Sequence, residues 1–394
     1  MTRRSALGIA AVAAVALATW AVTSVLVLGA DPAERPLSQG DPAACRGLPG
    51  DEGKACYVRE LSAMLRGRED PRPVVRDIAA RAWEEGGPFL SWCHGVMHTV
   101  GRRYASQSGV RLATLMDALP KGNDPACTAG FAHGLVTAVA SDIDVSRPAE
   151  AVRACGEAAT RYQRYSCIHG FGHAFVRSSG DLAPALDLCR GLGAQAPDCA
   201  QGAYHDYWFA ALGVDEARLA TEPETNPRVL CGEQPAEFVR PCWYRAFVEN
   251  RPEGFVAETP EDLDGLCAGL RGVQRSGCIT AASVIGPPDP AEQLALCSRL
   301  RSPADAASCV RGTKAQNLLD ADEDELGRLI GGCRRFGVRA GVRSACFEWL
   351  GKTLAVLTDG RFARSGCPRV RGVADRRACA AGAARMEDAL VTFS

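Results

Sequence analysis

Two neighbouring segments decide the fold: Leu182-Ala-Pro-Ala-Leu-Asp-Leu-Cys189 and, nine residues later, Cys199-Ala-Gln-Gly-Ala-Tyr-His-Asp-Tyr-Trp-Phe-Ala-Ala-Leu212. Apolar residues recur in both at spacings of three and four, which is typical of an amphipathic helix, and the strict alternation of a β-strand is absent. Each segment therefore predicts a helix. A disulfide between the two cysteines would join the end of the first helix to the start of the second, which makes the unit a stapled helical hairpin.

The same unit recurs along the chain. Sixteen of the 18 cysteines form eight local pairs separated by 10 to 13 residues: 45/56, 155/167, 189/199, 231/242, 267/278, 297/309, 333/346 and 367/379. The second members, together with Cys93 and Cys127, recur about every 36 residues, and a fixed period of this size indicates a repeat architecture. We therefore predict an all-α protein, an α-solenoid-like array of disulfide-stapled helical hairpins.

Composition narrows the function classes. The 394 residues carry a net charge of −1 and are 47% hydrophobic, which excludes wholesale disorder. Nucleic-acid binding is not expected, because it calls for an excess of clustered positive charge. Aromatic residues make up only 6%, which favours helices over a β-sandwich.

The first thirty residues indicate export. Arg3 and Arg4 precede an apolar run from Ala6 to Ala30, which is long enough to span a bilayer. Positive charge on the N-terminal side predicts a single-pass cell-membrane protein with its main body outside the cytoplasm. A cleaved signal, with a weak twin-arginine pattern, is the alternative. Export places the main body in an oxidising compartment, in which its cysteines are expected to form disulfides.

The predicted organisation has four parts. Residues 1–30 form the membrane anchor or uncleaved signal, and residues 31–44 form a linker rich in Pro, Asp and Gly. Residues 45–230 hold the N-terminal helical repeats, which contain every histidine. Residues 231–394 hold C-terminal repeats without histidine, suited to a structural role or to docking of a protein partner.

Cys93 and Cys127 are the two cysteines without a local partner. A ninth disulfide, linking adjacent repeats, is the simpler interpretation, since free thiols rarely persist in an oxidising compartment. The alternative is a thiolate metal ligand beside His94.

The six histidines of the chain occupy matching positions in four consecutive repeats. His133, His173 and His205 each lie six residues after the repeat's second cysteine, and His98 joins them with a shift of one place. His94 and His169 lie four residues before His98 and His173, on the same helix face. Later repeats carry Val248, Val284, Ala315, Lys352 and Arg385 at the aligned position, so the hairpin does not need histidine to fold.

The histidines divide into two triplets, which predicts a metal site. His94, His98 and His133 recur as His169, His173 and His205, at offsets of 75, 75 and 72 residues. Three imidazoles with an open position form the ligand set of a reactive metal ion. The two triplets either form separate sites or converge on one dinuclear centre.

The imidazole ligands limit which metals the site is expected to bind. Imidazoles suit zinc, copper, nickel or iron and not calcium or magnesium, and we predict Cu, Zn or Fe without resolving which. The zincin motif HExxH and the c-type haem motif CxxCH are absent from the sequence. Non-covalent haem with two axial histidines is a less favoured alternative.

The ligand pattern, two sets of an H-x3-H pair plus one histidine from another helix, resembles that of type-3 dicopper proteins such as tyrosinases and haemocyanins. The resemblance covers ligand number and helix spacing alone, and it implies dioxygen chemistry at two copper ions. Among the neighbours, Asp206 is placed to orient an imidazole. A substrate would contact Tyr204, Tyr207, Trp208 and Arg102.

Two function classes follow. The first is a membrane-anchored extracytoplasmic metalloprotein, leaning towards a metal-dependent oxidoreductase or hydrolase, although such a site also suits metal storage or sensing. The second is a helical-repeat scaffold for protein partners that holds no metal.

The glycine three residues after the second cysteine, as in Gly130, Gly202, Gly312 and Gly382, recurs with and without histidine. We expect it to allow close approach of neighbouring helices.

Overall fold

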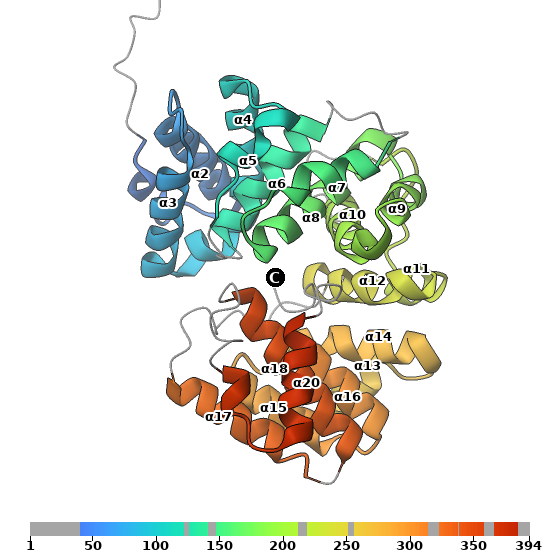
Figure 1. The fold of residues 1–394 in the computed structure, drawn as a ribbon. Helices are drawn as coiled ribbons and strands as arrows, with labels where there is room; N and C mark the ends of the chain where they lie inside the picture. Colours follow the sequence, from blue (N-terminus) through green and yellow to red (C-terminus); the bar gives the residue numbers. More distant parts are fainter. Residues whose placement is uncertain are drawn as a thin grey trace, which may run out of the picture.

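The computed structural model describes residues 40–121, 126–140, 147–211, 219–250, 256–313, 323–337, 339–357 and 366–384. Within these ranges the protein is all-helical and has no β-strand, which confirms the predicted class (Figure 1). The α-helices are α2 (Gly50–Leu65), α3 (Arg72–Glu85), α4 (Gly87–Ser108), α5 (Leu115–Ala118), α6 (Cys127–Val139), α7 (Ala149–Gly156), α8 (Arg161–Ser179), α9 (Leu182–Arg190), α10 (Ala196–Ala211), α11 (Pro227–Gly232), α12 (Ala236–Glu249), α13 (Pro260–Leu266), α14 (Gly272–Ala282), α15 (Pro290–Arg299), α16 (Pro303–Arg311), α17 (Glu323–Arg334), α18 (Ala340–Leu357) and α20 (Val373–Ala384). Short 3-10 helices are η1 (Pro42–Cys45), η2 (Leu112–Thr114), η4 (Gly193–Gln195), η5 (Ser283–Ile285) and η7 (Cys367–Arg369).

Local sequence signals set both ends of α8 and the start of α9. The Thr160 side chain accepts a hydrogen bond from the Gln163 backbone N–H and so caps the start of α8. Gly180 ends α8 with a φ of +69°, a left-handed conformation that glycine adopts without strain. Asp181 then caps α9 by accepting from the backbone N–H of Ala183. Two adjacent residues, Gly180 and Asp181, thus end one helix and begin the next.

Every cysteine is disulfide-bonded. All eight predicted local pairs are formed, each joining a first helix or its end to the helix that follows. Cys93 and Cys127 form the ninth disulfide, across 34 residues, and directly connect α4 to α6. No cysteine is free, so the proposal of a Cys93 thiolate ligand is wrong: its sulfur is bonded to that of Cys127.

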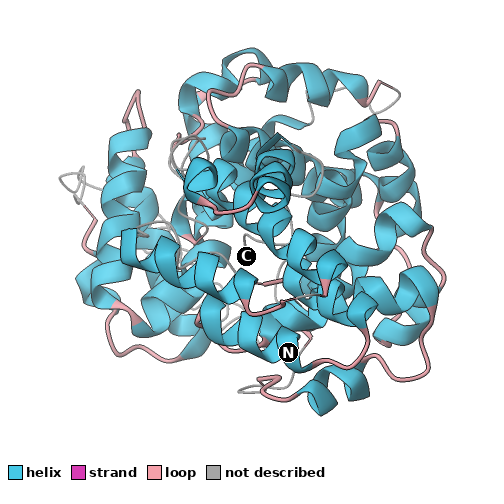
Figure 2. Ribbon diagram, turned by 60° about the horizontal axis from the view of Figure 1, so that its bottom comes forward, coloured by secondary structure: helices cyan, strands magenta, loops and turns pink. Residues whose placement is uncertain are grey.

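The helices that carry the second cysteine of each pair, together with α4 and α6, are called the core helices below. They are α2, α4, α6, α8, α10, α12, α14, α16, α18 and α20. Each contacts the next one in chain order. Helices α2 to α10 form the upper part of the molecule in Figure 1 and α13 to α20 the lower part, with α11 and α12 between them. Figure 2 shows that the described elements are helices joined by loops.

The last core helices pack back against the middle of this succession. Helix α18 contacts α8, and Arg161 at the start of α8 donates a hydrogen bond to the carbonyl oxygen of Ala383 on α20 at 2.8 Å. Almost every residue of α8 between Tyr162 and Val176 is buried as a result. Helix α8 therefore lies at the centre of the protein.

Glycines let the core helices touch backbone to backbone, as predicted. A Cβ on Gly130 of α6 would lie 2.2 Å from the carbonyl oxygen of His94 on α4, and one on Gly202 of α10 would lie 1.9 Å from that of His169 on α8. Gly312 and Gly382 make the same approach in the histidine-free part. This close contact therefore belongs to the architecture. Between α4 and α6, and between α8 and α10, it is made to the carbonyl oxygen of a histidine.

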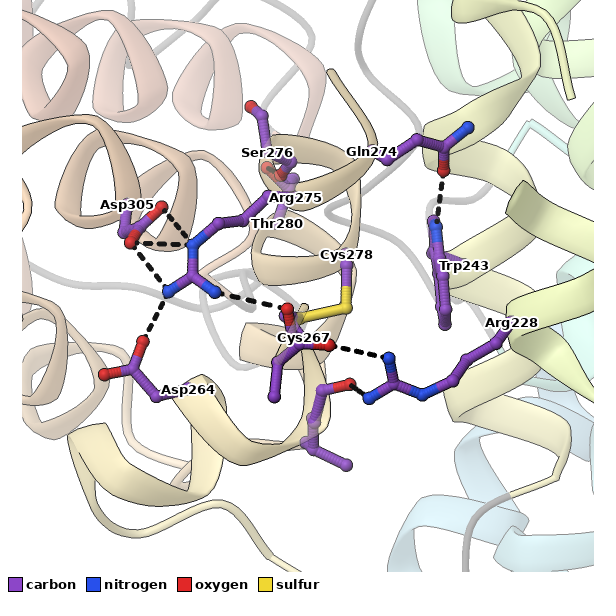
Figure 3. The surroundings of a disulfide bond; sticks show 12 residues. Arg228, Trp243, Asp264, Cys267, Gln274, Arg275, Ser276, Cys278, Thr280 and Asp305 are labelled. Carbon is purple, nitrogen blue, oxygen red and sulfur yellow. Dashed lines mark hydrogen bonds and ion pairs between the residues drawn. A yellow bond between two sulfur atoms is a disulfide. The ribbon is translucent and has the colours of Figure 1, made fainter. Parts of the chain in front are cut away.

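Arginine–aspartate pairs also link neighbouring core helices. Arg275 of α14 donates from Nε to both carboxylate oxygens of Asp305 on α16, at 3.2 and 3.1 Å, and from Nη1 to the carbonyl oxygen of Cys267, which is bonded to Cys278 (Figure 3). Arg343 of α18 holds Asp375 of α20 in the same way. In both pairs the guanidinium Nε has a carboxylate partner.

Among the described residues no helix is both long and apolar enough to cross a membrane. The predicted anchor, residues 1–30, and most of the predicted linker lie outside the described residues.

The Gly202 contact generates a stability prediction. Gly202→Ala places a methyl group against the His169 carbonyl, so α8 and α10 must separate, and we expect the free energy of unfolding to fall by about 1–3 kcal/mol. Gly327→Ala is the matched control, because Gly327 lies within α17 with open space around its Cα. There the substitution should preserve or raise stability. Denaturant unfolding with intact disulfides measures both, and equal stabilities would contradict the close-approach role.

Candidate metal centre

Four consecutive core helices carry the histidines, and the structure brings all six rings into one cluster. The residues are His94 and His98 on α4, His133 on α6, His169 and His173 on α8, and His205 on α10.

Ring contacts cross the boundary between the two predicted triplets. The ring centroids of His98 and His173 are 4.7 Å apart, and those of His133 and His169 are 4.3 Å apart and stacked. The histidines of the two predicted triplets thus lie together in one cluster.

Three groups of three histidines could hold a metal ion, since the ligand atoms within each group lie within 4.8 Å of one another. The groups are His94–His98–His205, His98–His133–His173 and His169–His173–His205. The last is the second predicted triplet, and the other two each combine histidines from both. Nitrogens bonded to one zinc ion at 2.0–2.1 Å are at most about 4.2 Å apart, so small side-chain rotations bring each group to bonding distance.

Burial keeps these imidazoles neutral. Five of the six histidines are at most 4% exposed, and His94 is partly exposed. Desolvation, followed by the charge of neighbouring groups, lowers the pKa of His98, His133, His169 and His205 well below the usual value. Desolvation also lowers the pKa of His173, although a hydrogen bond to Asp206 opposes the effect. A neutral imidazole has a lone pair available for a metal.

Asp206 orients an imidazole, as the sequence suggested. Its Oδ1 lies 3.2 Å from His173 Nδ1 and accepts hydrogen bonds from Arg177 Nε and Nη2 at 3.0 and 2.7 Å. Asp206 is fully buried. A carboxylate on one ring nitrogen fixes the tautomer and leaves Nε2 as the nitrogen that can bind a metal.

Tyr165 holds a second histidine. Its hydroxyl lies 3.1 Å from His169 Nδ1 and donates to Gln201 Oε1 at 2.9 Å. His169 Nε2 then faces His205 Nδ1 at 3.4 Å. A neighbouring side chain thus contacts Nδ1 of His169 and Nδ1 of His173. In both rings Nε2 lies on the side away from that neighbour.

Two ring nitrogens in the cluster have no hydrogen-bond partner in the described part of the chain. They are Nε2 of His133 and Nε2 of His173, both buried. A buried polar atom left unpaired costs about 1–3 kcal/mol, and unpaired atoms in native proteins usually have a functional reason. Both histidines belong to one of the three groups, so a metal ion would satisfy them.

The residues expected to contact a substrate have the following surroundings. Tyr204 and Trp208 are completely buried, and the Tyr207 hydroxyl donates to the carbonyl oxygen of Glu224. Arg102 donates to the hydroxyl of Thr99 at 3.3 Å. Nothing in these contacts indicates a substrate-binding role.

The sequence patterns did not predict two residues of the cluster, Arg245 and Glu249, which both lie on α12. Arg245 Nη2 lies 3.5 Å from His169 Nε2, and Glu249 Oε1 lies 3.3 Å from His205 Nε2. Their signal is positional: Arg245 takes the place of the recurrent glycine three residues after Cys242, and Glu249 aligns with Asp206, seven residues after the cysteine. The cluster thus includes side chains from both predicted repeat regions.

Comparison with models of protein families, with curated proteins and with solved structures found no match to this chain.

The contacts between rings favour ions over haem. The histidine rings lie 4.3 to 5.8 Å apart, centroid to centroid, close enough to touch one another. A haem with two axial histidines would need a porphyrin between two of them.

The lowered pKa values predict acid sensitivity of the metal-free protein. In the unfolded chain these histidines take up a proton below about pH 6.5, whereas in the folded chain they stay neutral to lower pH. The unfolded state then binds more protons, so stability is complete above pH 6.5 and falls as the pH drops further, by up to about 1.4 kcal/mol per pH unit for each histidine.

Denaturant unfolding of chelator-treated protein from pH 7.5 to pH 5 measures this slope. His133→Gln removes one titrating group and should make the slope shallower by up to one proton. A pH-independent stability, or an unchanged slope in the variant, would contradict the neutral-imidazole interpretation.

Proposed function

We propose that the protein binds transition-metal ions through the six-histidine cluster. The observation that carries the proposal is the pair of buried, unpartnered nitrogens, His133 Nε2 and His173 Nε2, among imidazoles grouped three at a time. Six histidines in mutual contact are a poor apolar core and a good ligand set. Copper, zinc and iron are the metals that suit imidazoles alone.

The three groups overlap, so no two of them can each hold an ion with three histidines of its own. His98, His173 and His205 each belong to two of the three groups. If one ion takes His169, His173 and His205, then His94, His98 and His133 remain for a second ion, which restores the division made by the sequence. We therefore propose a dinuclear centre in which each ion has three imidazole ligands and an open position.

The chemistry of such a site supports an enzyme. An ion with three histidines and an open position binds water, dioxygen or a substrate, as in hydrolases and oxidoreductases. In this chain Asp206 and Tyr165 would orient the ligands, and burial would exclude bulk water. We propose a metal-dependent enzyme of one of these two classes.

We also propose an extracytoplasmic location with an N-terminal membrane anchor. Nine disulfides support an oxidising compartment. The apolar run from Ala6 to Ala30 behind two arginines supports the anchor. We further propose that the core helices form an α-solenoid, supported by their contacts in chain order, with residues 231–394 available to a protein partner.

Metal content tests the proposal. The double variant His98→Gln/His173→Gln removes a member from every group, so we expect it to lose bound metal entirely. His133→Gln is the matched control, because two of the three groups keep all their members. Elemental analysis of protein exported into an oxidising compartment should find up to two ions per chain in the wild type and at least one in the control. Full metal content in the double variant would refute the site.

A further inference from the structure

A permanent positive charge is built into the histidine cluster. Arg245 lies on α12, which packs against α10, and its side chain is only 3% exposed. Its position is the one that glycine holds in the preceding repeats, at Gly130, Gly170 and Gly202. The repeat of Cys242 thus replaces the smallest side chain with a long cationic one, which ends beside the imidazole of His169.

The guanidinium of Arg245 has several contacts and one unpaired donor. It lies 5.3 Å from the ring centroid of Tyr244, and it interacts with the hydroxyl of Tyr165. Nη1 donates to Glu249 Oε1 at 3.0 Å, and Nη2 lies 3.5 Å from His169 Nε2, at the limit of a hydrogen bond. Nε is buried and has no hydrogen-bond partner within the described structure. Guanidinium donors are usually all paired when buried, and an unpaired one is costly.

Other arginines between core helices differ from Arg245. Arg275 and Arg343 each place Nε on an aspartate of the next core helix, and Arg177 places both Nε and Nη2 on Asp206. Those contacts account for a structural role. The Arg245 guanidinium therefore has hydrogen-bonding capacity left over at the cluster.

The positive charge of Arg245 indicates which kind of ligand its unused hydrogen-bond donor would bind. His169, His173 and His205 form one metal group, and Arg245 Nη2 lies 3.5 Å from one of its ligand nitrogens. A divalent ion there and the guanidinium repel each other, and the repulsion is poorly screened in a buried site. Glu249 offsets one charge only, and it already contacts both Arg245 and His205. An additional anion, bound to the ion and to Arg245, would relieve the repulsion.

We propose that the centre binds a small anion, a carboxylate or another oxyanion, at the open position of the ion held by His169, His173 and His205, with Arg245 donating to it. The inference rests on the proposed metal centre and names the substrate class for it. Planar bidentate recognition of oxyanions is what a guanidinium does best. Arg245 is then a binding residue for the substrate anion.

Azide binding to the copper(II)-loaded full-length protein tests the inference, because azide is a small anion whose bond to copper(II) gives a charge-transfer absorption band. We expect the wild type to bind azide and Arg245→Met to bind it at least tenfold more weakly at equal copper content. Arg245→Lys keeps the charge and should fall between the two. Arg164→Met is the control: Arg164 lies on α8, the helix of His169 and His173, but donates to the carbonyl oxygen of Gly156, so azide affinity should not change.

The outcomes separate the two proposals. Equal azide affinity in the wild type and Arg245→Met, both fully loaded with copper, would overturn the anion site and leave the metal centre standing. A wild type that takes up no copper would refute the metal centre, and the anion site with it. If Arg245→Met does not fold, Arg245→Lys decides: azide affinity equal to or above that of the wild type would overturn the role of the guanidinium.

Discussion

The close approach of α8 to α10, and of α4 to α6, is the constraint on which the rest of the structure depends. At Gly202 and at Gly130 the backbones of paired helices come so near that any side chain would collide with the carbonyl oxygen of a histidine on the partner helix. Histidines from different helices can meet only because these backbones touch. Disulfides fix the helix ends, and in the first pair Cys93–Cys127 joins the two helices directly, one residue before His94. The position of the cluster therefore follows from backbone packing.

Helices and disulfides could be predicted from the sequence because each rests on local spacing. A helix of three to five turns shows its apolar period, and a cysteine pair 10 to 13 residues apart has few partners to choose from. The glycine role was also predictable, because Gly312 and Gly382 recur where no histidine lies nearby. The residues of the histidine cluster could be predicted because they occupy matching positions in consecutive repeats.

What sequence spacing could not give is the way in which successive helix pairs turn towards one another. The contacts of His98 with His173 and of His133 with His169 depend on the angle between the α4–α6 pair and the α8–α10 pair, which no residue spacing records. Arg245 and Glu249 were missed for a related reason: they belong to a repeat without histidine, and only the packing of α12 against α10 places them in the site. Tyr204 and Trp208 sit beside His205 in sequence, yet the helix turns them into the core.

Charge balance connects the architecture to the proposed chemistry. Asp206 with Arg177, and Glu249 with Arg245, are two carboxylate–guanidinium pairs, each with its carboxylate on a histidine of the cluster. They surround neutral imidazoles, so the metal-free site carries little net charge, and the proposed ions would supply most of the charge of the loaded site. Buried, positively charged ions next to a guanidinium call for an anion. A substrate or a hydroxide is the natural candidate.

Anomalous X-ray diffraction from crystals of the metal-loaded protein, with data collected on both sides of the absorption edge of the bound metal, tests the central claim most directly. The account predicts anomalous peaks inside the cluster, about 2 Å from imidazole nitrogens of His98, His173 and His205 and their group partners. Peaks confined to surface carboxylates, or a cluster without anomalous density in a fully loaded crystal, would contradict it.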